Sequence, residues 1–250
     1  MDIELGKIYA VWLREVKRFT NSKSRVIGSL AMPMLFLVAL GGGFSQMIPG
    51  FNYGAFILPG IIAMTVLFTS IFAGVSIIWD REFGFLKEML ASPTSRENLV
   101  IGRVLGGATT AILQGLIVLV FGSLFLGAAA PPLQNLFVAI VLMTLLSCFC
   151  VAVGIAIASI VQEVETFQLI INLVIMPFFF LSNALFPVDK MPEWLRGVAL
   201  LNPLSYAVDG LRGLITGQAS FNIIFDFGLS LVFFVISIAV ATYLFSKTSI

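Results

Sequence analysis

The chain has 250 residues, of which 59% are apolar and only 11% are charged, and its mean hydropathy is +1.07. Soluble domains carry about 25% charged residues, so this composition excludes a protein whose whole surface faces water. A net charge of +1 without any histidine also excludes a strongly basic nucleic-acid footprint and an acidic tail. The composition therefore predicts an all-α polytopic membrane protein.

The first predicted element is an amphipathic helix over residues 3–20. Leu5, Ile8, Trp12 and Val16 recur at three- and four-residue intervals, and the basic side chains fall on the other face. A helix of this kind lies in the membrane interface. A simple surface anchor would give the same pattern.

Six stretches are apolar enough to cross about 30 Å of hydrocarbon, a distance that takes roughly 20 helical residues. The predicted spans are residues 26–44, 56–79, 99–126, 136–161, 167–186 and 223–245. The connections between them are short, so residues 1–250 are expected to form a single transmembrane domain.

The basic residues predict the orientation, because cytoplasmic loops carry an excess of lysine and arginine. Three of the fourteen fall on one side of the predicted membrane, Lys190, Arg196 and Arg212. The other eleven fall on the opposite side, Lys7, Arg14, Lys17, Arg18, Lys23, Arg25, Arg81, Lys87, Arg96, Arg103 and Lys247. We therefore expect a multi-pass protein of the cell (plasma or inner) membrane with both termini in the cytoplasm.

The connection at residues 80–97 is expected to carry a short cytoplasmic helix. Gly84 permits a sharp turn, and the next apolar side chains share one helical face opposite Lys87 and Glu88. These apolar residues are Phe85, Leu86, Met89 and Leu90. Such a helix suits docking into a partner's groove, although an ordinary polar loop remains an alternative.

The same connection contains signals for the end of one helix and the start of the next. Ser92 and Pro93 are expected to stop the short helix, because proline disfavours helical geometry in the residue before it. Thr94 and Glu97 have the spacing of a capping box, which predicts that Thr94 starts the third span.

Residues 187–218 are too polar to span a membrane but apolar enough to stay close to it, and they are expected outside the cell. Pro192 opens one short helix, in which Trp194 is an interfacial aromatic residue. Asn202 and Pro203 cap and start a second helix. On that helix Asp209 and Arg212 are three residues apart, a spacing that favours a structural ion pair.

The spans lack the groups that intramembrane chemistry requires. Charges occur only at their ends, as at Arg103 and Asp226, and the chain has no GxxxxGK[ST] phosphate loop. We therefore expect no catalytic, cofactor-binding or metal-binding residues, and an energy source outside this chain. Gly102 with Gly106 has the spacing of close helix packing, and Gln114 is expected to bond between helices.

At the 80–97 connection and at residues 186–213, the sequence resembles the permease family of the type-two ABC exporters, which includes drug-resistance, nodulation-factor and surface-polysaccharide export permeases. The matching residues are Glu82-x-Gly84 with Leu90-x-Ser92-Pro93-x-Ser95-Arg96, then Phe186-Pro187, Met191-Pro192-Glu193-Trp194-Leu195, Asn202-Pro203-Leu204 and Asp209-Gly210-Leu211-Arg212-Gly213. The resemblance extends over nearly the whole chain.

This resemblance implies a pore made of two permease copies, as a homodimer or heterodimer, with two ABC ATPase subunits on the cytoplasmic side. ATP and magnesium would then bind the partner ATPase, and this chain would not be an enzyme. The resemblance places an ATPase-coupling helix at Glu82, Gly84, Phe85, Leu86, Met89, Leu90, Ser92, Pro93 and Arg96. It places short re-entrant helices before the last span, containing Pro192, Trp194, Asn202, Pro203, Asp209 and Arg212.

The leading functional hypothesis is therefore a permease subunit that moves an amphiphile outward, whether drug-like, a lipid or a lipid-linked glycan. Two alternatives from other classes stay open. One is an ATP-independent channel or secondary transporter, and the other is a membrane scaffold subunit.

Overall fold

The computed structural model describes residues 4–47, 52–91, 94–126 and 131–247, and within these ranges it contains helices and turns but no strand. The helices are α1 (Leu5–Thr20), α2 (Lys23–Phe36), η1 (Leu37–Gly42), α3 (Gly43–Met47), α4 (Tyr53–Ala73), α5 (Val75–Glu82), α6 (Phe85–Ala91), α7 (Arg96–Phe125), α8 (Leu133–Ile160), α9 (Val164–Ile170), η2 (Ile171–Ile175), α10 (Met176–Phe180), η3 (Val188–Lys190), α11 (Glu193–Leu201), α12 (Pro203–Thr216) and α13 (Ile223–Ser246). The prediction of an all-α polytopic membrane protein is confirmed.

Within these described ranges, five helical segments are long and apolar enough to cross a membrane, namely Lys23–Ser45, Tyr53–Glu82, Arg96–Phe125, Leu133–Ile160 and Ile223–Ser246. Each matches a predicted span within a few residues. The sixth, Val164–Phe180, is a shorter apolar helix built from α9, η2 and α10. It ends at Phe180 rather than at the predicted residue 186, because the chain turns at Leu181 and Ser182.

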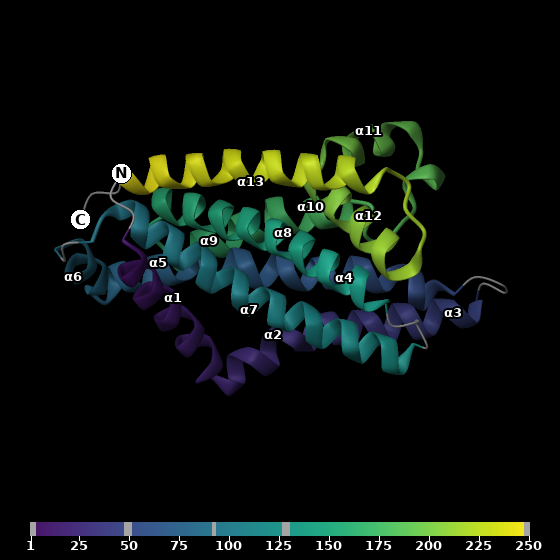
Figure 1. Cartoon of the computed structure of the whole chain (residues 1–250), viewed down its shortest axis with the longest axis horizontal. Coiled ribbons are helices and arrows are strands. Elements are labelled where there is room, and N and C mark those ends of the chain that lie inside the picture. Colours follow the sequence, from purple (N-terminus) through teal and green to yellow (C-terminus); the bar gives the residue numbers. More distant parts are fainter. Residues whose placement is uncertain (1–3, 48–51, 92–93, 127–130, 248–250) are drawn as a thin grey trace.

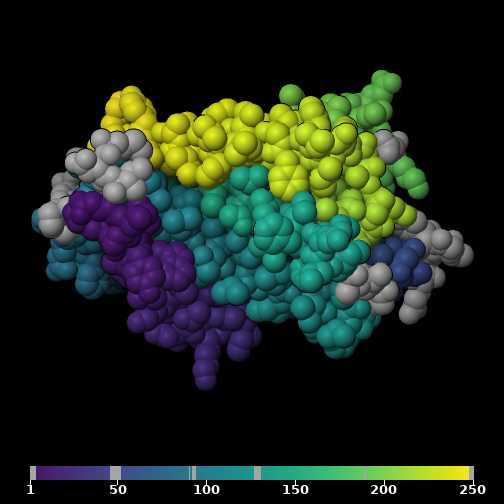
Figure 2. Space-filling model, viewed as in Figure 1, coloured from purple at the N-terminus to yellow at the C-terminus, as the bar shows by residue number. Residues whose placement is uncertain are grey.

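The long helices run side by side, and α4 lies in the middle of the bundle (Figure 1). Within the most apolar part of each span, 78% of the Tyr53–Glu82 residues are buried inside the chain, against 17% for Lys23–Ser45 and 17% for Ile223–Ser246. In Figure 2, α13 (yellow) covers one long side of the molecule. The core therefore sits around α4, and α2 and α13 present apolar faces outward.

The two ends of the bundle differ in composition. At one end lie α1, α6 and the last turn of α13, and at the other lie α3, α11 and α12 (Figure 1). We call the first the Asp80 end and the second the Asp209 end, each after a buried acid that lies there. The start of α1 and the end of α13 thus share one end.

Close contacts between backbones hold the central helices together. The chain turns at Gly74 between α4 and α5, and a Cβ atom at this position would lie 2.4 Å from the carbonyl of Gly154 on α8. Since real Cβ atoms do not approach so closely, only glycine allows this crossing. Small residues inside the spans therefore serve helix packing.

Candidate functional site

A buried ionic cluster lies where α1, α5 and α7 meet. Asp80 is only 2% exposed; its Oδ1 accepts from Arg14 at 2.7 Å and lies 3.5 Å from Arg18. Its Oδ2 accepts from Arg103 at 2.6 Å, and Arg103 also donates to the Ser76 hydroxyl at 3.0 Å. We call these five residues the Asp80 cluster. It links an interfacial helix to two membrane-spanning segments that are distant in the sequence.

The burial of these charges makes the cluster sensitive to change. Arg103 is 3% exposed, so Asp80 is the charge that compensates it away from water. Removing Asp80 would be costly, because the buried Arg103 charge would keep only the Ser76 hydroxyl as a partner. The side chains of Arg14 and Arg18 are 37% and 26% exposed, and so they can exchange Asp80 for water at lower cost.

The short helix α6 packs directly against this cluster. Gly84 has a φ of +78°, which permits the sharp turn from α5 into α6 that the sequence predicts. The Met89 sulfur accepts from Arg14 at 3.0 Å and lies 3.5 Å from Arg103. Any displacement of α6 therefore acts on the arginines that hold Asp80.

The faces of α6 differ from the predicted arrangement at one position. Leu86 was expected to share an outward face with Phe85 and Met89, but it is only 1% exposed and belongs to the chain's own core. A seven-residue helix lying on a bundle must direct one side chain per turn inward. Phe85, which is 52% exposed, is the outward apolar side chain of α6 instead.

A groove of about 420 Å³ separates α6 from α1. Its lining residues come from both helices and from the start of α7: Lys7, Ala10, Val11, Arg14, Phe85, Glu88, Met89, Thr94 and Leu99. The groove contains an exposed aromatic ring, charges of both signs, and Arg14 of the Asp80 cluster at its base. Its chemistry suits a protein partner with an apolar anchor and a charged rim.

The amphipathic helix α1 lies against α7 rather than only on the membrane surface. A Cβ atom at Gly102 would lie 2.7 Å from Val11, and one at Gly106 would lie 2.6 Å from Glu15. The glycine spacing therefore serves helix packing, as predicted, and its partner is α1.

Two further arginines bind helix ends near the cluster. Arg81 donates to the carbonyls of Val161 at 3.0 Å and Ala158 at 3.3 Å, at the C-terminus of α8. Arg96 donates to the Ser246 carbonyl at 2.5 Å, at the C-terminus of α13. The last carbonyls of a helix lack intrahelical donors and carry partial negative charge, so guanidinium groups stabilise both ends.

The other residues predicted for the coupling segment lie at the end of α5, in α6 or outside the described residues. Glu82 is the exposed last residue of α5, and the backbone of Leu90 belongs to α6. Ser92, Pro93 and the side chain of Leu90 lie outside the described residues. The predicted capping box at Thr94 is wrong: Ser95 is the N-cap of α7 and accepts from the Asn98 amide at 3.3 Å.

That shift of one residue has a simple cause. Ser95 and Asn98 also have the spacing of a cap and its bonded amide, and serine is a stronger N-cap residue than threonine. Ser95 takes the extended geometry of a cap, with φ −64° and ψ 147°.

At the other end of the bundle, Asp209 is 0% exposed and its carboxylate has a complete set of partners. Oδ1 accepts from the Asn183 side chain at 3.0 Å, and Oδ2 accepts from the Ser220 and Phe221 amides, both at 2.8 Å. Arg212 lies 4.0 Å away. The predicted pair is thus part of a larger network that joins α12 to the segments before and after it.

Arg212 is anchored by groups beyond its own helix. Its guanidinium donates to the Asn183 carbonyl at 2.7 Å and lies 4.1 Å from the ring centroid of Phe56 on α4. Burial lowers the pKa of Arg212 to about 10, while Asp209 and Tyr53 act in the opposite direction. The side chain therefore stays charged at neutral pH.

The helices of this segment begin where the sequence predicts. Pro192 is the N-cap of α11, and Trp194 is 71% exposed on it. Asn202 is the N-cap of α12 and accepts from the Leu204 amide at 3.0 Å, followed by Pro203 in the first turn. These residues start the helices, and only Pro192 and Trp194 among them are exposed, whereas Asp209 and Arg212 hold the segment on α4.

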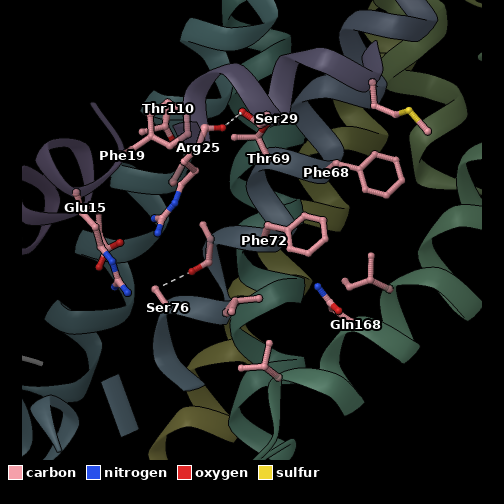
Figure 3. Close-up of a pocket in the computed structure, with 18 of the residues that line it drawn as sticks. Glu15, Phe19, Arg25, Ser29, Phe68, Thr69, Phe72, Ser76, Thr110 and Gln168 are labelled. Atoms are coloured by element: carbon pink, nitrogen blue, oxygen red, sulfur yellow. Dashed lines mark hydrogen bonds between the residues drawn. The ribbon is translucent and has the colours of Figure 1, made fainter. Parts of the chain in front are cut away.

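A cavity of about 460 Å³ lies between α1, α2, α4, α5, α7 and the Val164–Phe180 helix, and we call it the Trp79 cavity (Figure 3). Beside it, Gln114 joins three helices, since its Nε2 donates to Ser29 at 2.5 Å and its Oε1 accepts from Thr69. The expectation that Gln114 bonds between helices is confirmed. Both of its partners also line the cavity.

The residues that organise each end are not apparent from the sequence patterns alone. Asp80, Arg14, Arg18 and Arg103 were counted only as charges, and Asn183 was not singled out. One signal was present for the first group: an acid at the end of a span faces arginines from two other segments expected on the same side. No comparable signal pointed to Asn183.

Comparisons with known proteins agree with this architecture. A family model described as ABC-2 type transporter matches residues 6–216. The chain is 30% identical over 251 residues to the transport permease ycf38 of Cyanophora paradoxa, which covers 93% of this chain and 86% of that protein.

Two bacterial relatives align over nearly their whole length. Nodulation protein J of Rhizobium leguminosarum bv. viciae is 26% identical to this chain, and the alignment covers 95% of this chain and 93% of that protein. The inner membrane transport permease YadH of Escherichia coli K12 is 26% identical, and the alignment covers 90% of this chain and 89% of that protein. The chain therefore belongs to the ABC-2 type transporter family and is a multi-pass membrane transport permease.

Proposed function

We propose that this permease is the membrane-spanning subunit of an ATP-driven exporter whose ATPase is a separate chain. The groove between α1 and α6 is the observation that carries this proposal. It combines an exposed aromatic anchor, Phe85, with charged residues on both walls. ATP and magnesium would bind the partner, since this sequence has no phosphate loop.

Motion of the ATPase would reach the membrane through the Asp80 cluster. A partner that moves α6 displaces Met89, which contacts both Arg14 and Arg103. Arg14 lies on α1, and Arg103 lies on α7, so both helices respond to the same displacement. Asp80 then transmits it into the α4–α5 span.

A second permease copy would complete the pathway. The outward faces of α2 and of the Val164–Phe180 helix carry large exposed apolar side chains, including Ile27, Leu35, Leu169 and Leu173 at 60–80% exposure. Lipid or another copy of this fold suits such faces. The proposed substrate is an amphiphile, which moves outward between the two copies.

In this proposal the Asp80 end faces the cytoplasm and the Asp209 end faces outside, as the distribution of lysine and arginine favours. Single cysteines in place of Lys7, Lys190 and Lys247 test the orientation in intact cells. A membrane-impermeant thiol reagent should label position 190 and neither of the other two. Labelling at 7 or 247, or no labelling at 190, would contradict the orientation.

The alternative functions make different predictions about the groove. A channel, a secondary transporter or a scaffold subunit needs no ATPase at α6. Co-expression with a phosphate-loop ATPase encoded beside this permease separates the classes, because the exporter requires a stable complex and ATP hydrolysis that responds to the permease.

The docking test uses exposed positions. Phe85→Asp should release the ATPase, because burial of a phenylalanine side chain contributes about 1.5–3 kcal/mol. Phe83→Asp is the matched control, since Phe83 is more exposed and does not line the groove. Leu86→Asp is unsuitable, because a buried charge in the core would destabilise the permease itself. Retention of the ATPase by Phe85→Asp at the wild-type level would refute docking in this groove.

A further inference from the structure

The Trp79 cavity combines a basic end with an apolar length. Figure 3 shows Glu15 and Arg25 on one side of it and the rings of Phe68 and Phe72 on the other. Met32 and Phe72 line the cavity, yet they are 54% and 42% exposed, so the cavity opens to the surroundings of the bundle. Its volume falls in the range of about 300–1,000 Å³ that is typical of small-molecule sites.

The basic end contains a cation that is available to a ligand. The guanidinium of Arg25 lies 5.3 Å from the Trp79 ring centroid and forms no ion pair with any of the described residues. Arg18 lies over the same ring at 5.4 Å, and among the described residues it forms an ion pair only with Asp80, at 3.5 Å. Asp80 already accepts shorter bonds from two other arginines. Positive charge is therefore incompletely neutralised beside an amphipathic ring.

One acid in the cavity restricts which ligands can bind at the basic end. Glu15 also lines the basic end, and its Oε1 atom is buried and accepts no hydrogen bond within the part of the chain that the structure describes. This oxygen would repel an anionic group that offered it no donor. A hydroxyl or ammonium group beside the anion would satisfy it.

We propose that the Trp79 cavity receives the transported substrate from the membrane leaflet at the Asp80 end, and that this substrate is an amphiphile with an anionic phosphate or carboxylate headgroup. The headgroup pairs with Arg25 and Arg18, because guanidinium groups bind these anions with two parallel hydrogen bonds. The apolar tail lies along Met32, Phe68 and Phe72. The inference rests on the proposed export function and adds the chemical class of the substrate.

The binding test needs no ATPase. The permease is placed in phosphatidylcholine nanodiscs and exposed to dodecyl phosphate with a photoreactive diazirine in its tail. Labelled peptides should come from α2, α4 and η2. An uncharged dodecyl alcohol or a dodecyl ammonium probe should label these peptides weakly, and inorganic phosphate should not compete, because it has no tail.

Variants at the basic end identify the headgroup contact. Arg25→Gln should raise the half-labelling concentration about tenfold, the loss expected for a charge-assisted hydrogen bond. Arg25→Lys should recover most of the affinity. Lys23→Gln is the matched control, because it removes the same charge from an exposed residue in the same turn of α2 that does not line the cavity.

Several outcomes would overturn the inference. Equal labelling by the neutral alcohol, or unchanged labelling in Arg25→Gln, would exclude headgroup recognition. Competition by inorganic phosphate would indicate a site for free phosphate. Labelling that persists unchanged through ATP turnover in the ATPase complex would indicate a resident lipid instead of a substrate. Failure of binding leaves ATPase docking intact, and failure of docking leaves binding intact, so the two proposals are separated.

Discussion

Asp80 and Asp209 are buried aspartates at opposite ends of the bundle, and each lies beside arginine, but their partners differ in kind. Asp209 accepts two backbone amides and a buried amide side chain, and its arginine donates to a backbone carbonyl. The partners of Asp80 are three arginine side chains from α1 and α7. Two of these side chains, Arg14 and Arg18, reach solvent.

Backbone partners and side-chain partners respond differently to force. A carboxylate bonded to backbone amides can move only if the chain around it rearranges. A carboxylate shared among long arginine side chains can exchange partners while each helix stays intact. The comparison indicates that the network around Asp209 is rigid, and we call it the brace. The Asp80 cluster can rearrange while its helices stay intact, and we call it the joint.

The largest expected effect is on folding, at the brace. Asp209→Asn removes the charge that compensates Arg212 and turns an amide group toward the backbone donors. We expect a loss of about 3–5 kcal/mol, the usual cost of breaking a buried pair. Unfolding by denaturant in detergent micelles measures it. Glu193→Gln, on the exposed side of α11, should change stability by less than about 0.5 kcal/mol, and equal losses in the two variants would remove the distinction.

A smaller and more local effect is expected at the joint. Asp80→Asn leaves Arg103 bonded to Ser76 and lets Arg14 and Arg18 turn toward water. We expect a loss of about 1–3 kcal/mol, the range for a buried group that loses its partner. Amide hydrogen exchange should accelerate in α1 and remain unchanged in α12.

Glu82→Gln is the matched control for this variant, because Glu82 lies two residues later on the same helix and is exposed. Its exchange pattern should equal that of the wild type. Faster exchange in α12 of the Asp80→Asn variant would mean that the two ends unfold together, contrary to the comparison.

The smallest effect on stability is expected for Arg14→Ala. The side chain is 37% exposed, and an exposed ion pair contributes about 0–1 kcal/mol. Its loss should nevertheless remove one of the contacts that hold Met89, so exchange in α6 should rise while the unfolding midpoint hardly changes. Lys17→Ala, on the exposed side of the same helix, should alter neither quantity. A large drop in the unfolding midpoint of Arg14→Ala would show that the joint is as rigid as the brace.

Much of the fold could be predicted from local sequence. Apolar length identified the spans, the three- and four-residue periodicity identified α1, and Asn202 with Pro203 identified the start of α12. These features depend on residues that lie within one or two helical turns of each other. Thr94 was misassigned because Ser95 competes for the same cap.

The site could be predicted only in part, because its contacts join distant segments. Leu86 and Phe85 are adjacent and both apolar, and only the docking of α6 on the bundle decides that one is buried and the other exposed. Likewise, Arg14 lies 66 residues from Asp80 in the sequence, and no periodicity pairs them. Tertiary packing selected these partners.

The central claim is that the Asp80 end moves while the Asp209 end does not. Pulsed electron spin resonance tests it on the permease in complex with its ATPase, with spin labels at Ala10 and Lys87 across the groove and, separately, at Leu133 and Gln218 near the brace. All four side chains are exposed, and the native Cys148 and Cys150 are buried and should not take the label. Non-hydrolysable ATP should shift the Ala10–Lys87 distance distribution and leave the Leu133–Gln218 distribution unchanged. A fixed Ala10–Lys87 distance, or a shift at Leu133–Gln218 alone, would contradict the account.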